Sequence, residues 1–333
     1  MPTILYVYED RIPEALRAFV RSYFPRSEFE LVEMSYAEPL ARQKEKVASA
    51  DAILCAPGRF LADEVLFAAR RARLIQLWSS GFDKFNVAGA TAAGIPVATN
   101  GGANASSVAE HAVLLMLAVS RRLPEMDRKA RSGSWGGSSY GMDMQTLEGK
   151  RLGIVGFGNI GKIVAQKVLG FGMEVRYFDT CRAALEEEKR LAAAFLPFDE
   201  LLNTADIVTL HLHANSSTKN ILNTRSFSLL KKGALLINTA RAELVEKEAL
   251  CTALQSGALF GAGLDVFEKE PPLSDDPFFS FPTVVATPHS AGSNRDAYAR
   301  MMEHSTRNIR RALAGEEVCW SVNGLVRLEN TLA

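Results

Sequence analysis

The feature that most constrains this chain is a glycine-rich turn between a predicted strand and a predicted helix. The segment Arg151-Leu-Gly-Ile-Val-Gly-Phe-Gly-Asn-Ile-Gly161 places Gly156, Gly158 and Gly161 in the pattern G-x-G-x-x-G. Such a turn lets the backbone approach a pyrophosphate closely, and the helix that follows presents free N–H groups and a partial positive charge. The pattern therefore predicts a dinucleotide-binding loop.

An acidic residue follows where such a loop needs one. The next predicted strand runs from Met173 to Asp179 and ends 18 positions after Gly161. A carboxylate at this place accepts hydrogen bonds from an adenosine ribose and repels a 2′-phosphate. The sequence thus predicts NAD as the cofactor, while the nearby Arg182 leaves NADP open as an alternative.

Composition excludes several classes of protein. At 333 residues the chain is long for one core, so we expect two domains. Lysine plus arginine equals aspartate plus glutamate at 38 each, which indicates neither a nucleic-acid partner nor a membrane surface. The longest apolar run, 112–119, is far shorter than the ~20 residues of a bilayer span. Four scattered cysteines without a C-x-x-C indicate reduced thiols and no metal site. We therefore expect a cytoplasmic protein.

Strand and helix patterns alternate in two series, which predicts an α/β fold with doubly wound parallel sheets. Between the series, Ser107-Val-Ala-Glu110 has the pattern of a capping box and predicts the start of a long helix that ends near Pro124. A last helix over 293–313 is expected to return to the first domain. The predicted strands are 3–8, 28–33, 51–56, 74–78 and 96–99 in the first series, and 151–155, 174–178, 206–210, 234–238, 261–266 and 284–286 in the second.

Three residues with complementary chemistry follow predicted strands of the second series: Arg241, Glu270 and His289. Ligands of an open parallel sheet lie outside the carboxyl ends of its strands. Arginine binds a carboxylate in a bidentate way, and histidine donates a proton near neutral pH. A glutamate beside that histidine would orient the ring. The set suits the reduction of a 2-keto acid by NADH. Taken singly, an arginine after a strand is more often a surface residue and a Pro-His pair more often a turn, and Glu270 also fits one solvated acid among several.

The chain resembles the D-isomer-specific 2-hydroxyacid dehydrogenase family over nearly its whole length. The resemblance implies a Rossmann-type NAD-binding domain, residues 104–289, inserted into a smaller flavodoxin-like substrate-binding domain, residues 1–103 and 290–333. The segments that carry it are Ser80-Gly-Phe-Asp83, Gly94-Ile-Pro-Val97, Asn104-Ala-Ser-Ser-Val-Ala-Glu-His111, the loop 156–161, Ile237-Asn-Thr-Ala-Arg241, Gly263-Leu-Asp-Val-Phe-Glu-Lys-Glu-Pro271 and Thr287-Pro-His-Ser-Ala-Gly292.

The resemblance also implies roles for residues. Asp265 would hold the nicotinamide carboxamide, or be a strand-end acid without a special role. Asn104 would line the substrate pocket, or only cap a helix, and His211 would lie beside the cofactor or serve packing. The implied catalytic residues are Arg241, Glu270 and His289; the substrate-binding residues are Ser80, Gly81, Asn104 and Arg241; the cofactor-binding residues are Gly156, Gly158, Asn159, Ile160, Gly161, Asp179, His211, Thr239, Ala240 and Asp265.

The resemblance further narrows the reaction. It implies the interconversion of a 2-keto acid and its (R)-2-hydroxy acid, with His289 as acid and base. Glu270 argues against formate, because relatives that oxidise formate usually carry an amide there, and Ser80 argues against phosphite. We expect glyoxylate or hydroxypyruvate before 3-phosphoglycerate, since no phosphate-binding cluster surrounds Ser80. A homodimer is implied, with the Trp135 loop and the 107–122 helix at its interface. The alternative is an NAD(H)-responsive corepressor with incidental dehydrogenase activity.

Overall fold

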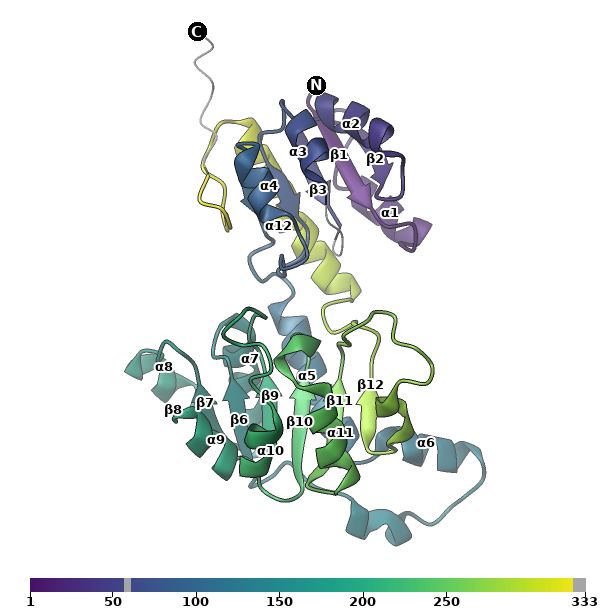
Figure 1. Ribbon diagram of the computed structural model, residues 1–333, viewed down its shortest axis with the longest axis vertical. Coiled ribbons are helices and arrows are strands. Elements are labelled where there is room, and N and C mark those ends of the chain that lie inside the picture. Colours follow the sequence, from purple (N-terminus) through teal and green to yellow (C-terminus); the bar gives the residue numbers. More distant parts are fainter. Residues whose placement is uncertain (57–60, 326–333) are drawn as a thin grey trace. The chain divides into compact units, whose positions relative to one another are not determined.

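The computed structural model describes residues 1–56 and 61–325 and divides into two compact units. Unit 1 comprises Met1–Asn104 and Asn294–Ala333, and unit 2 comprises Ala105–Ser293 (Figure 1). Residues 326–333 of the predicted substrate-binding domain lie outside the described residues. Each unit is a parallel α/β sheet with helices, so the predicted fold class is confirmed.

Unit 1 is built on a five-stranded parallel sheet in the order β2-β1-β3-β4-β5. Its strands are β1 (Thr3–Tyr8), β2 (Glu30–Ser35), β3 (Ala52–Cys55), β4 (Ile75–Leu77) and β5 (Val97–Ala98), and its helices are α1 (Glu14–Arg21), α2 (Leu40–Ser49), α3 (Asp63–Ala68), α4 (Val87–Ala92) and α12 (Arg295–Leu313).

Successive residues of β1 point to opposite faces of this sheet, as the pleat of a strand requires. Leu5 and Val7 are buried in the core that the sheet shares with α2 and α3. Ile4 and Tyr6 are buried in a second core, which includes Met301 of α12. The last helix therefore packs on unit 1, as the sequence predicted.

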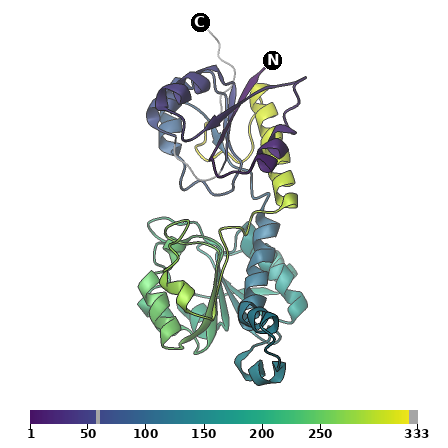
Figure 2. The ribbon, with the colours of Figure 1, turned by 90° about the vertical axis from the view of Figure 1, so that its right-hand side faces the viewer.

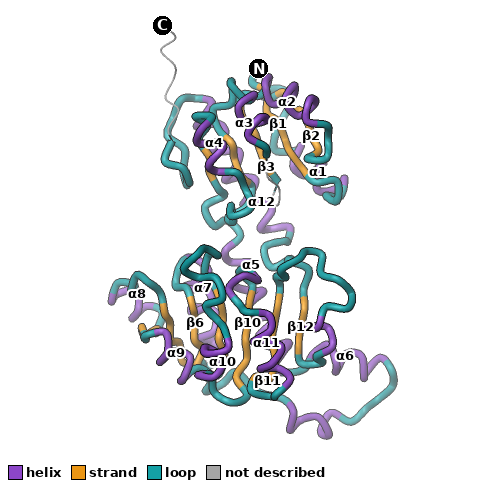
Figure 3. The backbone as a smooth tube through the Cα atoms, viewed as in Figure 1, coloured by secondary structure: helices purple, strands orange, loops and turns teal. Residues whose placement is uncertain are grey.

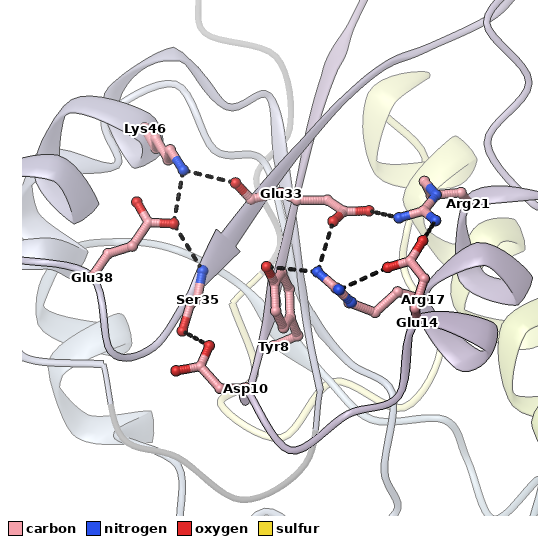
Figure 4. Close-up of polar contacts among 9 residues, drawn as sticks. All are labelled: Tyr8, Asp10, Glu14, Arg17, Arg21, Glu33, Ser35, Glu38 and Lys46. Atoms are coloured by element: carbon pink, nitrogen blue, oxygen red, sulfur yellow. Dashed lines mark hydrogen bonds and ion pairs between the residues drawn. The ribbon is translucent and has the colours of Figure 1, made fainter.

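A network of charged side chains joins α1 to the edge strand β2 (Figure 4). Glu33 of β2 accepts a hydrogen bond from Arg21 Nη1 at 2.7 Å and lies 3.6 Å from Arg17 Nη1. Both arginines also pair with Glu14, and Arg17 donates to the Tyr8 hydroxyl at 2.9 Å. Because every charge here has an opposite partner, the network ties the helix to the sheet and leaves no obvious ligand site.

Unit 2 contains a seven-stranded parallel sheet in the order β12-β11-β10-β9-β6-β7-β8. Its strands are β6 (Arg151–Val155), β7 (Glu174–Phe178), β8 (Ala193–Phe195), β9 (Ile207–Leu210), β10 (Ala234–Asn238), β11 (Leu259–Leu264) and β12 (Val284–Ala286). Its α-helices are α5 (Ala105–Ser120), α6 (Leu123–Arg131), α7 (Asn159–Val168), α8 (Leu185–Arg190), α9 (Phe198–Thr204), α10 (Thr224–Leu229) and α11 (Lys247–Gln255), with 3₁₀ turns over Gly137–Asp143, Leu169–Phe171, Ala242–Leu244 and Pro277–Ser280.

Helices cover both faces of the unit 2 sheet (Figure 2). Leu152 and Ile154 of β6 are buried in a core with Leu115 of α5. Val155 is buried in the opposite core with Leu250 of α11. Strands buried on both faces consist almost wholly of apolar residues, which is why their positions were legible in the sequence.

The strand order of unit 2 reverses beside β6. The chain runs from β6 outward to β7 and β8 and then returns to β9, on the other side of β6. Val155 and Leu210, the last residues of β6 and β9, are register partners. The loops that follow these two strands therefore begin next to each other at one edge of the sheet (Figure 3). Ligands of doubly wound sheets bind at such a switch point.

The structure corrects the prediction for the connecting helix. Helix α5 begins at Ala105, so Ser107 lies inside it, buried, and the capping-box interpretation is wrong. Glu110 instead pairs with Lys167 of α7 at 2.9 Å. The helix ends at Ser120, and Pro124 lies in the first turn of a separate helix, α6. The short strand β8 was not predicted at all.

Candidate active site

The glycine loop has the geometry that a pyrophosphate requires. Gly156 has φ +97°, where a side chain would be strained, and a Cβ on Gly161 would lie 2.2 Å from the Gly156 carbonyl oxygen. A Cβ on Gly158, by contrast, would meet nothing within 4 Å. Gly156 and Gly161 thus hold the turn and the helix start of α7 together, and Gly158 faces open space. The loop fits a dinucleotide.

Asp179 is placed at the end of β7, beside this loop. Its Oδ2 accepts the backbone N–H of Phe157 at 2.7 Å, and its Oδ1 accepts that of Cys181 at 3.0 Å. The carboxylate therefore holds the glycine loop against the turn after β7. This structural task was not foreseen, and it is compatible with the ribose-binding role that the sequence predicts.

Two predicted cofactor residues carry buried polar atoms without hydrogen-bond partners. These are His211 Nδ1, after β9, and Thr239 Oγ1, after β10. His211 Nε2 shares a hydrogen bond with the Thr209 hydroxyl at 3.0 Å. Burial lowers the pKa of His211 to about 3, so its imidazole is neutral at physiological pH. Unpaired buried polar atoms are rare and suggest a missing partner, which again fits a bound dinucleotide.

Arg241 is positioned by a turn that Asn238 organises. Asn238, buried at the end of β10, donates from Nδ2 to the Arg241 carbonyl at 2.8 Å and accepts the Ala240 N–H at 3.0 Å. Arg241 Nη1 in turn donates to the Ala240 carbonyl at 2.7 Å. Asn238 was not among the predicted site residues, although it stands inside the segment 237–241, which carries the family resemblance.

Glu270 and His289 form a close pair. The carboxylate oxygens of Glu270 lie 2.9 and 2.8 Å from His289 Nδ1. Glu270 Oε1 also accepts the Phe267 N–H at 3.2 Å, which fixes its orientation. The His289 side chain is 45% exposed. The predicted pair is therefore present, and Glu270 contacts the ring at Nδ1.

The loop that carries His289 is folded around a buried carboxylate. Asp265, wholly buried after β11, accepts the N–H groups of Ser290 and Ala291, each at 2.9 Å. It also accepts the Thr287 hydroxyl at 2.6 Å. His289 itself has φ +51°, an unusual conformation for a side-chain-bearing residue. Asp265 thus anchors the turn that presents His289.

A further histidine completes this network. His111 Nε2, on α5, lies 2.9 Å from Thr287 Oγ1 and 3.6 Å from Asp265 Oδ1. Because the single hydroxyl hydrogen of Thr287 is donated to Asp265, the His111 nitrogen must be the donor to Thr287. This role of His111 and Thr287 was not predicted. They are 176 positions apart, and no local pattern relates them.

The predicted substrate-binding residues of unit 1 lie together. Ser80 Oγ is 2.6 Å from Asn100 Oδ1 and 2.8 Å from Asn104 Oδ1. Asn100, which the sequence analysis did not name, is fully buried and donates to the Trp78 carbonyl at 2.7 Å. The side chains around the Ser80 hydroxyl are thus neutral amides, held in place by the fold.

Within residues 1–56 and 61–325, no helix is both long and apolar enough to span a membrane. Across those same ranges, no three His, Cys, Asp or Glu side chains gather as metal ligands would.

Comparison with known proteins identifies the class of this protein. The family model for the NAD-binding domain of D-isomer-specific 2-hydroxyacid dehydrogenases matches residues 113–291. The chain is 33% identical to a glyoxylate reductase of Thermococcus litoralis over 314 residues, which covers 90% of this chain and 94% of that protein. It is 36% identical to a D-3-phosphoglycerate dehydrogenase of Mycobacterium leprae, over 83% of this chain but only 52% of that protein.

A solved structure, the pyruvate reductase of Chlamydomonas reinhardtii, superposes with a TM-score of 0.80 at 25% identity and covers 96% of this chain and 98% of that one. The chain therefore belongs to the D-isomer-specific 2-hydroxyacid dehydrogenase family. As a member, it is an NAD-dependent dehydrogenase that interconverts 2-keto and 2-hydroxy acids.

Proposed function

We propose that this enzyme acts on a small, unphosphorylated 2-keto acid, and that glyoxylate and hydroxypyruvate are its preferred substrates. Where the product is chiral, we propose that it has the (R) configuration. The observation that carries the proposal is the Glu270–His289 pair, with its carboxylate 2.8 Å from the ring nitrogen Nδ1. This contact orients the imidazole, and in this proposal Nε2 gives a proton to a carbonyl oxygen and takes it back.

In this proposal the chain's own residues bind and polarise the substrate. Arg241 pairs with the substrate carboxylate, helped by the backbone N–H groups at Ser80 and Gly81, with Asn104 lining the pocket. His289 protonates the oxygen at C2 from Nε2, and Glu270 accepts a hydrogen bond from Nδ1 throughout this transfer. When bound, NADH supplies the hydride.

The cofactor would be held by the loop after β6 and by residues that follow neighbouring strands. Backbone groups at Gly156, Gly158, Asn159, Ile160 and Gly161 would bind the pyrophosphate. The ribose would be bound by Asp179, the carboxamide by Asp265, and the remaining contacts would come from His211, Thr239 and Ala240. Because the pKa of His211 is so low, it would contact the cofactor as a neutral group.

Neutral surroundings at Ser80 support an unphosphorylated substrate. The partners of its hydroxyl are the amides of Asn100 and Asn104, whereas a phosphate would require cationic side chains. The similarity to a glyoxylate reductase over nearly the full length of both proteins supports the same choice.

We also propose a cytoplasmic homodimer. The segment after α5 exposes large apolar side chains, Trp135 at 90% and Met142 at 96%. In Figure 1 this segment, with α6, extends away from the unit 2 sheet. Exposed apolar groups on a projecting segment are typical of an interface, and α5 adds the half-exposed Leu114. No observation favours the corepressor alternative, and we do not propose it.

A substrate screen tests the proposed reaction. Purified enzyme is assayed for NADH oxidation with glyoxylate, hydroxypyruvate, pyruvate and bulkier 2-keto acids. The 2-keto acid that corresponds to 3-phosphoglycerate is included as the phosphorylated substrate. We expect the first two to give the highest kcat/KM, and His289→Ala to lower turnover by about 100-fold or more while NADH still binds. The exposed His213→Ala serves as control. Turnover on none of these acids would contradict the proposal, and wild-type turnover by His289→Ala would remove the acid–base assignment.

A further inference from the structure

An ion pair holds Arg182, the first cationic residue after Asp179 in the sequence. Arg182 donates from Nε to Glu188 Oε1 at 2.9 Å and from Nη2 to Glu188 Oε2 at 3.0 Å. Two parallel hydrogen bonds between a guanidinium and a carboxylate are the strongest arrangement that these groups form. The Arg182 side chain is 58% exposed, and its guanidinium also lies 5.7 Å from the centre of the Phe195 ring.

The carboxylate that receives Arg182 is itself fixed by the fold. Glu188 is only 7% exposed, which is unusual for a glutamate. The hydroxyl of the buried Tyr177 donates to Glu188 Oε1 at 2.7 Å, and this hydroxyl accepts the Ala183 N–H at 2.9 Å. Hydrogen bonds from Arg182 and Tyr177 lower the pKa of Glu188, so it is charged at neutral pH. Arg182 is therefore bound to a rigid anion.

These groups adjoin the predicted adenosine site. Arg182 is three positions after Asp179, and the N–H of the intervening Cys181 bonds to the Asp179 carboxylate. Helix α8 holds a second cation in the same way, because Glu187 Oε2 lies 2.7 Å from Lys162 Nζ in the first turns of α7. Two acids of α8 thus bind one cation of α7, the helix that follows the glycine loop, and one cation of the turn after β7.

We propose that Glu188 is a specificity-determining residue for the cofactor: by pairing with Arg182, it withholds from the adenosine ribose the guanidinium that a 2′-phosphate requires. The inference rests on the proposed binding of NAD beside Asp179. Proteins that accept NADP commonly use an arginine near this position. Here the arginine is present, but NADPH must break a bidentate ion pair to recruit it, in addition to overcoming repulsion by Asp179. NADH needs no cation there and is unaffected.

The proposal is tested by binding, apart from turnover. Dissociation constants for NADH and NADPH are measured by isothermal titration calorimetry on the wild type and on Glu188→Gln, which removes the charge but keeps the shape. We expect Glu188→Gln to lower the dissociation constant of NADPH about tenfold, which is the scale of one arginine–phosphate contact. The dissociation constant of NADH should change by less than about twofold. Adding Arg182→Gln should abolish the gain, because the freed cation is then absent.

Matched variants exclude a general effect of charge or folding. Glu186→Gln removes the same charge from an exposed position of α8 and should change neither constant. If Glu188→Gln does not fold, Glu188→Asp is measured in its place, because its shorter side chain withdraws the carboxylate from Arg182. The dissociation constant of NADPH should then fall as well, but by a smaller factor. Unchanged NADPH affinity, or equal changes for both cofactors, would overturn the proposal.

The proposed function fails by a different result. Were the wild type to bind neither cofactor, NAD binding itself would be wrong. Were Asp179→Ala to leave the ratio of NADH to NADPH affinity unchanged, only the role of Asp179 would be lost, whatever Glu188→Gln shows.

Discussion

At the scale of single residues, the site depends on side chains whose protonation is set by burial. His211 follows β9 at the strand-order reversal, with Nδ1 buried and unpaired. The sequence left open whether it packs or binds. The structure shows that it is held neutral, since its pKa falls from 6.5 to about 3 through desolvation. A neutral ring keeps a positive charge out of this part of the unit 2 core.

This shift makes stability depend on pH in a definite direction. Below pH 6.5 the unfolded chain protonates His211 while the folded chain does not, so the unfolded state binds more protons. The His211 contribution is therefore complete above pH 6.5 and is lost progressively as pH falls towards 3. In urea unfolding at several pH values, His211→Asn should show a shallower acid-side loss than the wild type. The exposed His213→Asn should keep the wild-type slope, and an unchanged slope in His211→Asn would refute this account.

At the scale of elements, His289, the proposed acid and base, is presented by a loop rather than by a strand or helix. Residues 287–291 follow β12, and the carboxylate at the end of β11 organises them. Helix α5 contributes His111 from the other side of Thr287. Three elements that are distant in the chain therefore define where His289 lies, and the loop needs no internal regularity.

Removing the central hydroxyl tests this arrangement. Thr287→Val leaves the His111 N–H without its acceptor and Asp265 without one donor, both in buried surroundings. We expect the free energy of unfolding to fall by about 1–3 kcal/mol, the cost of unsatisfied buried groups, and kcat to fall with it. Denaturant unfolding and steady-state turnover are the measurements. Thr252→Val, on an exposed face of α11, should have little effect. Wild-type stability of Thr287→Val would show that the network does not support the loop.

At the scale of the whole molecule, the proposed dimer follows from one projecting segment. Replacing Trp135 and Met142 with serine should remove apolar contact area and weaken association. Sedimentation velocity should report twice the 36.3 kDa chain mass for the wild type and a shift towards the single chain for the variant. Phe67→Ser, which alters an exposed apolar residue of unit 1, should leave the mass unchanged. A wild-type chain that sediments as a monomer would contradict the dimer.

The sequence by itself determined the elements whose patterns are local. Strands β6, β7, β10 and β12 lie where they were predicted. Of these, β6 and β10 are almost wholly buried, and strands buried on both faces are short apolar runs. The glycine loop could be predicted because the backbone of one turn requires glycine at Gly156 and Gly161. Boundaries were less well predicted where tertiary contacts decide them, as for α5, whose Ser107 is buried within the helix instead of capping it.

Only the tertiary structure decided which side chains meet. Glu270 and His289 could be suggested from their positions after strands, but His111 with Thr287, and Glu188 with Arg182, could not. Such contacts depend on the order of strands and on which helix face is buried, and these are properties of packing over the whole unit. A single arginine after Asp179 thus left NADP open in the sequence, whereas in the folded chain that arginine is bound to Glu188.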